Sequence, residues 1–169
     1  MKTKNRLELA TVSRRGVALL GILGIGAMAS GFVQSTKPKE TRTSIHQEIT
    51  FDASPAKVYE ALLDSKKFAA LTGMTATIHR EEGGAFKTFN GIIEGRNIEL
   101  VKDKRIVQAW RPNYWEKGMY SVVKMELVPK GARTKLILDH TGFPAEAYEG
   151  FDTGWPKRYW EPLKRFLAR

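Results

Sequence analysis

The sequence predicts an α+β fold in which a curved antiparallel sheet wraps a long C-terminal helix, with two short helices after the first strand. Two patterns lead to this prediction. From residue 45 the chain shows one strand-like segment, a stretch of helical spacing, and then a series of alternating segments separated by turn residues. Residues 148–168 return to helical spacing. With 42% hydrophobic and 27% charged residues among 169, the composition is that of one globular domain.

The first strand and the two short helices are indicated by neighbouring patterns. Apolar and polar residues alternate over 45–51, which predicts a strand. Ser54 can accept hydrogen bonds from free helix amides and Pro55 suits the first helical position, so we expect a helix from there to about residue 64. A second short helix is expected over 65–71, before Gly73 ends it.

Turn residues then divide the chain into six further strands. We expect them over residues 74–80, 85–89, 92–101, 105–111, 120–128 and 133–141. Asn90-Gly91 is a strong hairpin signal between the second and third of these. The tail over 148–168 is expected to be mainly helical, with Pro156 tolerated in a first turn and Pro162 kinking or restarting the helix.

The first 29 residues are predicted to be an export signal. A basic, polar start is followed by an apolar run over 17–29, which is shorter than the roughly 20 residues of a membrane-spanning helix. Arg14 and Arg15 before this glycine-containing run are typical of a twin-arginine signal, and Ala27 and Ala29 form an A-x-A cleavage site. An ordinary secretory signal and a longer, uncleaved anchor are the alternatives. All three predict a periplasmic or otherwise extracytoplasmic domain, in contact with the membrane only through this signal or anchor.

Residues 30–44 are predicted to be a flexible tether, because they are rich in Ser, Thr, Lys and Gly and show no periodicity. The folded domain is therefore expected over 45–169. Of the net charge of +10, residues 1–29 contribute five basic residues and one acidic residue, so the remainder is only moderately basic. Without a motif or a block of like charges, this balance indicates a solvated surface and no nucleic-acid partner.

Several strings, taken in order, resemble the SRPBCC superfamily, whose helix-grip fold is shared by START lipid-binding domains and birch-pollen-allergen-like proteins. Within it the chain is most similar to the C-terminal-domain family of the activator of heat-shock protein 90 ATPase. The resemblance extends over about 45–167. The matching strings are Phe51-Asp52-Ala53-Ser54-Pro55, Val58-Tyr59-Glu60-Ala61-Leu62, Gly83-Gly84-Ala85-Phe86, Phe89-Asn90-Gly91, Gly95, Ile98-Glu99-Leu100-Val101, Ile106-Val107-Gln108-Ala109-Trp110-Arg111, Tyr120-Ser121, Thr141-Gly142-Phe143-Pro144, Gly154-Trp155 and Tyr159-Trp160.

This resemblance implies a helix-grip fold with a cavity between the sheet and the long helix. Members of the superfamily bind hydrophobic or amphipathic small molecules, and some are enzymes or act on partner proteins. The heat-shock protein 90 activator also has an N-terminal domain that engages the chaperone, and in this chain a signal and a tether precede the domain instead.

Strand alternation predicts which side chains would line such a cavity. Residues two apart point to the same face of a strand, so the large apolar groups and the polar groups between them share one face. The predicted cavity wall consists of Ile106, Gln108, Trp110, Ser121, Val123, Met125, Leu136, Leu138 and His140. Gln108, Ser121 and His140 would be polar groups in a mostly apolar hollow, an arrangement that orients ligands in small-molecule pockets.

Each of these polar residues also has a purely structural interpretation. His140 could hydrogen-bond a ligand or belong to a buried network, and Gln108 requires a partner of either kind. Trp155 and Tyr159 are one helical turn apart, which favours packing of the final helix on the sheet. Tyr114 and neighbouring Trp115 lie in an expected loop, where an aromatic ring could gate a cavity or anchor the loop.

Other chemistry has little support. The chain has no cysteine, and its three histidines lie in separate predicted strands without ligand spacing, so neither metal nor another cofactor is expected. Asp139 and His140 are adjacent in one strand and point to opposite faces, and no other acid–base pair or nucleophile is visible. The first hypothesis is therefore a non-catalytic protein that binds a hydrophobic small molecule. A module that binds a partner protein is the second hypothesis, and an enzyme is the third and weakest.

Overall fold

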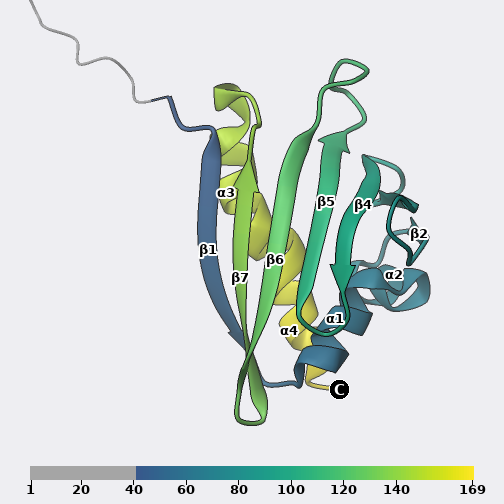
Figure 1. The fold of residues 1–169 in the computed structure, drawn as a ribbon, viewed down its shortest axis with the longest axis vertical. Helices are drawn as coiled ribbons and strands as arrows, with labels where there is room; N and C mark the ends of the chain where they lie inside the picture. Colours follow the sequence, from purple (N-terminus) through teal and green to yellow (C-terminus); the bar gives the residue numbers. More distant parts are fainter. Residues whose placement is uncertain (1–40) are drawn as a thin grey trace, which may run out of the picture. The chain divides into compact units, whose positions relative to one another are not determined.

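The computed structural model describes residues 41–169, and the predicted signal and most of the tether lie outside the described residues. Its elements follow the predicted order (Figure 1). They are β1 (Ser44–Phe51), α1 (Pro55–Leu63), α2 (Ser65–Thr72), β2 (Thr77–Ile78), β3 (Ala85–Thr88), β4 (Ile93–Val101), β5 (Arg105–Pro112), β6 (Ser121–Lys130), β7 (Arg133–Thr141), the 3-10 turn η1 (Ala145–Ala147), α3 (Tyr148–Trp155), the π-helical segment η2 (Pro156–Trp160) and α4 (Glu161–Leu167).

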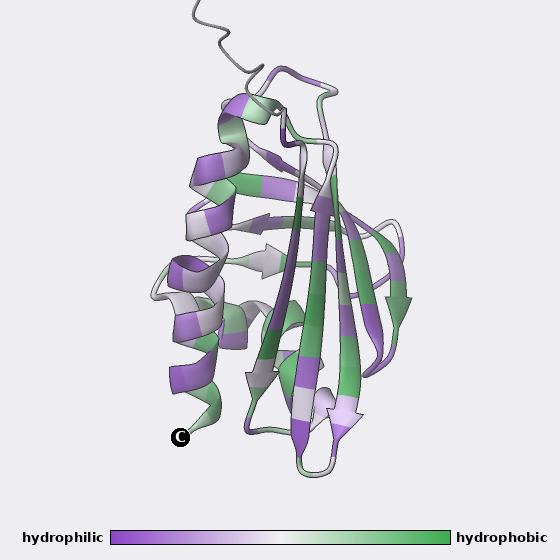
Figure 2. Cartoon of the chain, turned by 90° about the vertical axis from the view of Figure 1, so that its left-hand side faces the viewer, coloured by the Kyte–Doolittle hydropathy of each residue, from purple (hydrophilic) through white to green (hydrophobic). Residues whose placement is uncertain are grey.

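The strands form one seven-stranded antiparallel sheet in the order β1-β7-β6-β5-β4-β3-β2. The helical tail crosses one face of this sheet and leaves the other face open (Figure 1). Along the long strands hydrophobic residues alternate with hydrophilic ones, as the green and purple segments of Figure 2 show. The predicted fold class, a curved sheet packed on a C-terminal helix with two short helices after the first strand, is confirmed.

The two short helices begin and end as their residues predict. Ser54 caps α1, its hydroxyl accepting from the backbone N–H of Lys57 at 3.4 Å. The Asp64 carboxylate caps α2 in the same way, at 2.9 Å from the N–H of Lys67, and Gly73 ends α2 in the left-handed conformation. These helices close the lower end of the core, where α1 packs against β6, β7 and α4.

The strand predicted over 74–80 is much shorter than expected, because only Thr77 and Ile78 pair with β3. The backbone on either side finds side-chain partners in place of a strand. The N–H of Thr75 donates to the Asn90 side-chain oxygen at 2.8 Å, and the N–H of Ile78 donates to the Ser65 hydroxyl at 2.8 Å. Asn90 itself lies in the predicted β3–β4 turn, which spans four residues because β4 begins at Ile93.

The helical tail runs from Tyr148 to Leu167 through both prolines. Pro156 has no N–H, so it cannot donate to the carbonyl of Asp152 one turn earlier. That carbonyl accepts from the Gln47 side-chain nitrogen at 3.0 Å, while the Gln47 side-chain oxygen accepts from the Trp160 indole at 2.7 Å. Pro156 lies in the first turn of η2, as predicted, within a continuous helical tail that β1 supports. No helix among residues 41–169 is long and apolar enough to cross a membrane.

Candidate functional site

The predicted wall residues all lie on the face of the sheet that the helical tail covers. All are buried, and Gln108, at 9%, is the most exposed of them. They come from the three central strands β5, β6 and β7, whose register places Gln108 opposite Val123 and Val123 opposite His140. The alternation therefore brings these residues together as predicted. Binding of a ligand by these residues would also require an empty volume beside them.

Two of the three polar wall residues, His140 and Ser121, form a continuous buried hydrogen-bond chain with the Trp155 indole and the carbonyl of Trp110. The Trp155 indole N–H donates to Nδ1 of His140 at 3.2 Å, and Nε2 of His140 lies 2.8 Å from the Ser121 hydroxyl. The Ser121 hydroxyl donates to the carbonyl of Trp110 at 2.8 Å. Because an indole can only donate, Nδ1 must accept and the proton must reside on Nε2. Every member of the chain is satisfied by a protein partner.

Burial holds His140 in its neutral form. Its ring is completely buried and lies edge-on or tilted between four aromatic rings, those of Trp110, Phe143, Phe151 and Trp155. This desolvation lowers the pKa of His140 from 6.5 to about 3. A neutral imidazole with both nitrogens engaged is a structural group that joins the tail to the sheet, and it is not available to exchange protons with a ligand near neutral pH.

Gln108 also faces a neighbour. Its side-chain nitrogen donates to the side-chain oxygen of Asn97 at 2.9 Å, and the Asn97 nitrogen donates to the carbonyl of His79 at 2.8 Å. Asn97 reaches this position because the β4–β5 pairing is irregular between Asn97 and Glu99, which leaves Ile98 half exposed. The amide thus ties β5 to β4 and to the segment that precedes β3.

The space beneath the helical tail is small. Ile106, Gln108 and Met125 line a hollow of only about 20 Å³, together with Tyr159 and residues of α1, α2 and β2 to β3. A volume of this size is comparable to one water molecule. Five of the predicted wall residues line neither this hollow nor the larger groove described next: Ser121, Val123, Leu136, Leu138 and His140.

A larger, half-open groove of about 310 Å³ lies between α3 and the adjacent ends of β4 and β5. Trp110 is the one predicted wall residue that lines it. The others that line it are Phe89, Ile92, Ile93, Tyr114, Glu146, Ala147, Gly150, Phe151, Gly154, Trp155, Arg158 and Tyr159. Strand alternation could not find this groove, because most of its lining comes from the helix and from loops. The sequence did place Tyr114 at a possible cavity mouth, and it is 73% exposed there.

The glycines of α3 leave the wall of this groove bare. Gly150 and Gly154 are four residues apart, and a Cβ atom at either position would meet no atom within 4 Å. Glycine inside a helix costs roughly 1 kcal/mol relative to alanine. No neighbouring atom among residues 41–169 would exclude an alanine side chain at these two positions, so packing does not explain why they are glycine.

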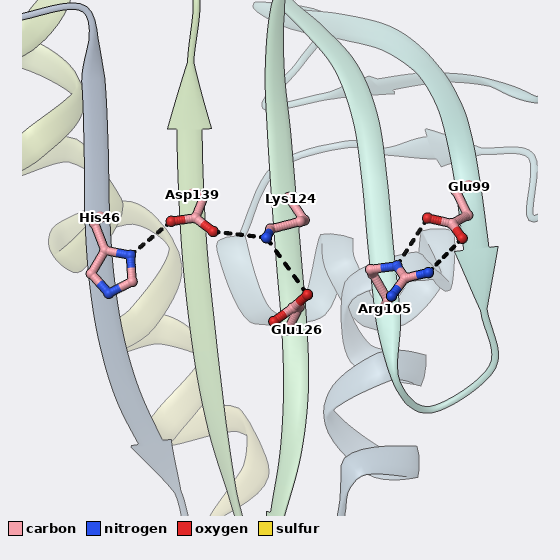
Figure 3. A network of polar contacts seen from close by, with 6 residues as sticks. All are labelled: His46, Glu99, Arg105, Lys124, Glu126 and Asp139. Atoms are coloured by element: carbon pink, nitrogen blue, oxygen red, sulfur yellow. Dashed lines mark hydrogen bonds and ion pairs between the residues drawn. The ribbon is translucent and has the colours of Figure 1, made fainter.

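The open face of the sheet carries a network of charges (Figure 3). Asp139 of β7 lies between His46 of β1 at 2.7 Å and Lys124 of β6 at 3.0 Å. The hydrogen bond from His46 and the Lys124 ammonium lower the pKa of Asp139, although its partial burial opposes them. Farther across the sheet, Arg105 binds Glu99 with two hydrogen bonds of 2.6 and 2.9 Å. No helix among residues 41–169 covers this face.

Comparison with known proteins identifies the family. The model of the activator of Hsp90 ATPase homolog 1-like proteins matches residues 52–168. The chain belongs to this family.

Within residues 41–169, no group of His, Asp and Glu side chains could hold a metal ion, and the buried polar chain described above contains no acid–base pair.

Curated relatives of this Hsp90-activator family are proteins about three times as long as the match. The human activator of 90 kDa heat shock protein ATPase homolog 1 is 30% identical over 116 residues, which cover 69% of this chain and 34% of that protein. The Dictyostelium discoideum homolog is 30% identical over 138 residues, which cover 81% of this chain and 36% of that protein. The chain therefore corresponds to about a third of the length of these relatives.

Solved structures show the same fold in the Hsp90-activator family. An HSP90 activator from Plasmodium falciparum superposes with a TM-score of 0.72 at 26% identity, covering 75% of this chain and 97% of that one. A dimer from Colwellia psychrerythraea, solved in solution and described as Aha1, superposes with a TM-score of 0.65 at 20% identity, covering 75% and 96%. The second likeness, at this identity, concerns the fold alone.

Proposed function

We propose that this domain binds a partner protein through its surface, as a co-chaperone-like module of the Hsp90-activator type. The observation that carries the proposal is the filled interior: the hollow under the tail is about 20 Å³, and His140 and Gln108 bond to protein neighbours. Because this hollow is too small for a ligand, we assign the function to the outer surface of the domain. Membership of the activator family supports a protein as the partner.

The open face of the sheet is the surface that we propose for this contact. A shallow hollow of about 470 Å³ crosses β1, β7, β6 and β5, with Val107 and Val122 as its apolar floor and His46, Lys124 and Asp139 at its polar rim. Val122 is 41% exposed. An apolar centre surrounded by charges is the usual composition of a protein–protein interface.

The test measures the ATPase rate of a purified Hsp90 with and without the purified protein, and the binding of the two by calorimetry. We expect binding and a higher rate. Lys124→Glu would place a carboxylate beside Asp139 and should weaken binding at least tenfold, whereas Lys164→Glu on α4 should leave it unchanged. Absence of both binding and stimulation in the unmodified protein, or equal effects of the two variants, would refute this surface.

A small amphipathic ligand is the second candidate function, and the aromatic groove beside α3 favours it. A volume of about 310 Å³ is at the lower end of the range for small-molecule sites. Besides aromatic rings, the groove is lined by one carboxylate, Glu146, and one guanidinium, Arg158. Native mass spectrometry of the purified protein should then reveal a retained small molecule. Gly154→Trp would fill the groove and should remove that mass, whereas Gly131→Ala in the β6–β7 turn should not. A protein that carries no added mass would exclude this function for the purified form.

We also propose export through residues 1–29. Support comes from the sequence alone: Arg14 and Arg15 precede the apolar run, and Ala27 and Ala29 follow within it. Fractionation of a bacterial host that produces the full chain should locate the protein outside the cytoplasm. Replacing both arginines by lysine should retain it inside if the route is twin-arginine export, and should change nothing if the route is ordinary secretion. Export would separate the chain from a cytosolic chaperone, so this result also decides in which compartment its partner must be sought.

A further inference from the structure

The exposed large hydrophobic side chains of residues 41–169 gather at one end of the sheet. Strand register identifies that end: Ile93 pairs with Pro112, Trp110 with Ser121, and Ser44 with Thr141. The loop over 113–120 connects β5 and β6 there (Figure 1). Of the eight such side chains, five lie at or beside this end, which we call the loop end: Met74, Ile92, Tyr114, Met119 and Tyr120.

The loop over 113–120 carries Tyr114, Met119 and Tyr120, and the side chain of Arg111 holds it against the sheet. Arg111 is buried, and its guanidinium donates to the carbonyls of Pro112, Asn113 and Trp115. It also pairs with Glu94 at 3.5 Å, and the Tyr120 ring lies over it with its centroid at 5.8 Å. Backbone carbonyls fixed by one buried cation keep the loop in a single arrangement. The apolar side chains are thus presented to solvent by an ordered support, which reduces the entropy that a contact must overcome.

The chain enters the folded domain at the same end. The carbonyl of Thr43 accepts from the N–H of Gly142 at 3.0 Å, and β1 begins at the next residue. In the sequence, the apolar run over 17–29 is separated from Ser44 by the fourteen residues 30–43. Fourteen residues span at most about 50 Å when fully extended, and roughly 20 Å as a flexible chain. A membrane that holds residues 17–29 is therefore within reach of the loop end.

We infer that, in the form of the chain that keeps residues 1–29 as an uncleaved anchor, the loop end is a lipid-facing surface that contacts the bilayer holding this anchor. Tyrosine side chains are favoured at the boundary between headgroups and acyl chains, and Tyr114 and Tyr120 are 73% and 46% exposed there. The loop itself carries one acidic and one basic residue, Glu116 and Lys117. Because these charges balance, the contact depends on apolar burial and does not select anionic lipids.

The absence of cysteine from the sequence makes this surface testable in the full chain. Tyr114→Cys and Met119→Cys place single environment-sensitive fluorophores on the loop end. Val128→Cys, which is 37% exposed at the opposite end of β6, is the matched control. Each labelled chain is reconstituted into vesicles of phosphatidylcholine, with or without a third of phosphatidylglycerol, and quenched with aqueous iodide or with lipids that carry a nitroxide on the acyl chain.

We expect labels at 114 and 119 to shift to shorter wavelength, to lose at least half of their iodide quenching and to gain quenching by the nitroxide lipid, equally in both vesicle types. The label at 128 should behave as it does in solution. Iodide quenching at 114 and 119 equal to that at 128 overturns the inference, as does failure of the chain to bind vesicles. Protection from iodide without lipid quenching also overturns it, since the loop end would then be covered by protein.

Discussion

Acid should destabilise this protein through one buried histidine. The unfolded chain takes up a proton on His140 below its ordinary pKa of 6.5, whereas the folded protein resists protonation until about pH 3. Between these values the unfolded state binds more protons, so stability falls as the pH falls. The contribution is complete above about pH 7. It decreases by about 1.4 kcal/mol for each pH unit below 6.5.

From pH 7.5 to pH 5.0 the loss from His140 amounts to about 2 kcal/mol. With a denaturant dependence of about 2 kcal/mol per molar urea, the unfolding midpoint should fall by about 1 M. The measurement is a series of urea titrations followed by tryptophan fluorescence at half-unit steps of pH. The series ends at pH 5 so that His140 can be observed without Asp139. Because the pKa of Asp139 is lowered, this carboxylate becomes protonated only in more acidic solutions.

A variant without the imidazole separates His140 from the other groups. His140→Gln keeps an acceptor for Trp155 and a donor for Ser121 but cannot titrate, so its midpoint should vary much less over the same range. His79→Gln, at an exposed position, is the control and should retain the full dependence. The reasoning would be refuted if His140→Gln lost as much stability between pH 7.5 and 5.0 as the unmodified protein.

Three further predictions concern packing and can be checked by urea unfolding. Trp155→Phe leaves Nδ1 of His140 without its donor and should cost at least about 2 kcal/mol, whereas Trp115→Phe, whose indole makes no such bond, should cost less than about 1 kcal/mol. Gly95→Ala should cost at least about 2 kcal/mol, because its Cβ would clash with the backbone carbonyl oxygen of Ala109 in β5. Gly154→Ala should instead stabilise by up to about 1 kcal/mol, because its Cβ enters open space inside a helix. A neutral Gly95→Ala, or a destabilising Gly154→Ala, would show that the backbone contacts at these positions differ from those described.

Alternation along the strands was enough to assign the buried face. The period of two placed Gln108, Ser121 and His140 on the side that the tail covers, since side-chain direction follows from backbone geometry alone. Solvent exposure does not follow in the same way. Arg111 is next to Trp110 and so points to the opposite face, yet it is buried under the loop over 113–120. A loop that folds back over a strand end reverses the solvent exposure of that strand, and no local pattern encodes this.

The space beside those residues could not be predicted. Whether Gln108 faces a ligand or a neighbour depends on Asn97, which reaches it only because of the irregularity in β4. The volume left between sheet and helix is a small difference between large side-chain volumes, so it depends on the packing of many residues at once. The groove beside α3 depends on where the helix lies above Ile92 and Tyr114, which is a property of the assembled domain.

The two hydrogen bonds of Gln47 have a consequence for the design of shortened proteins. The family match begins at residue 52, after β1 has ended. Yet β1 pairs with β7 along its whole length, and its Gln47 supplies both the donor that Pro156 cannot provide and the acceptor for Trp160. A fragment that begins at residue 52 would lack the two Gln47 hydrogen bonds that hold the helical tail. It would also expose β7 as a new edge of the sheet, and such an edge can pair with the same edge of another copy.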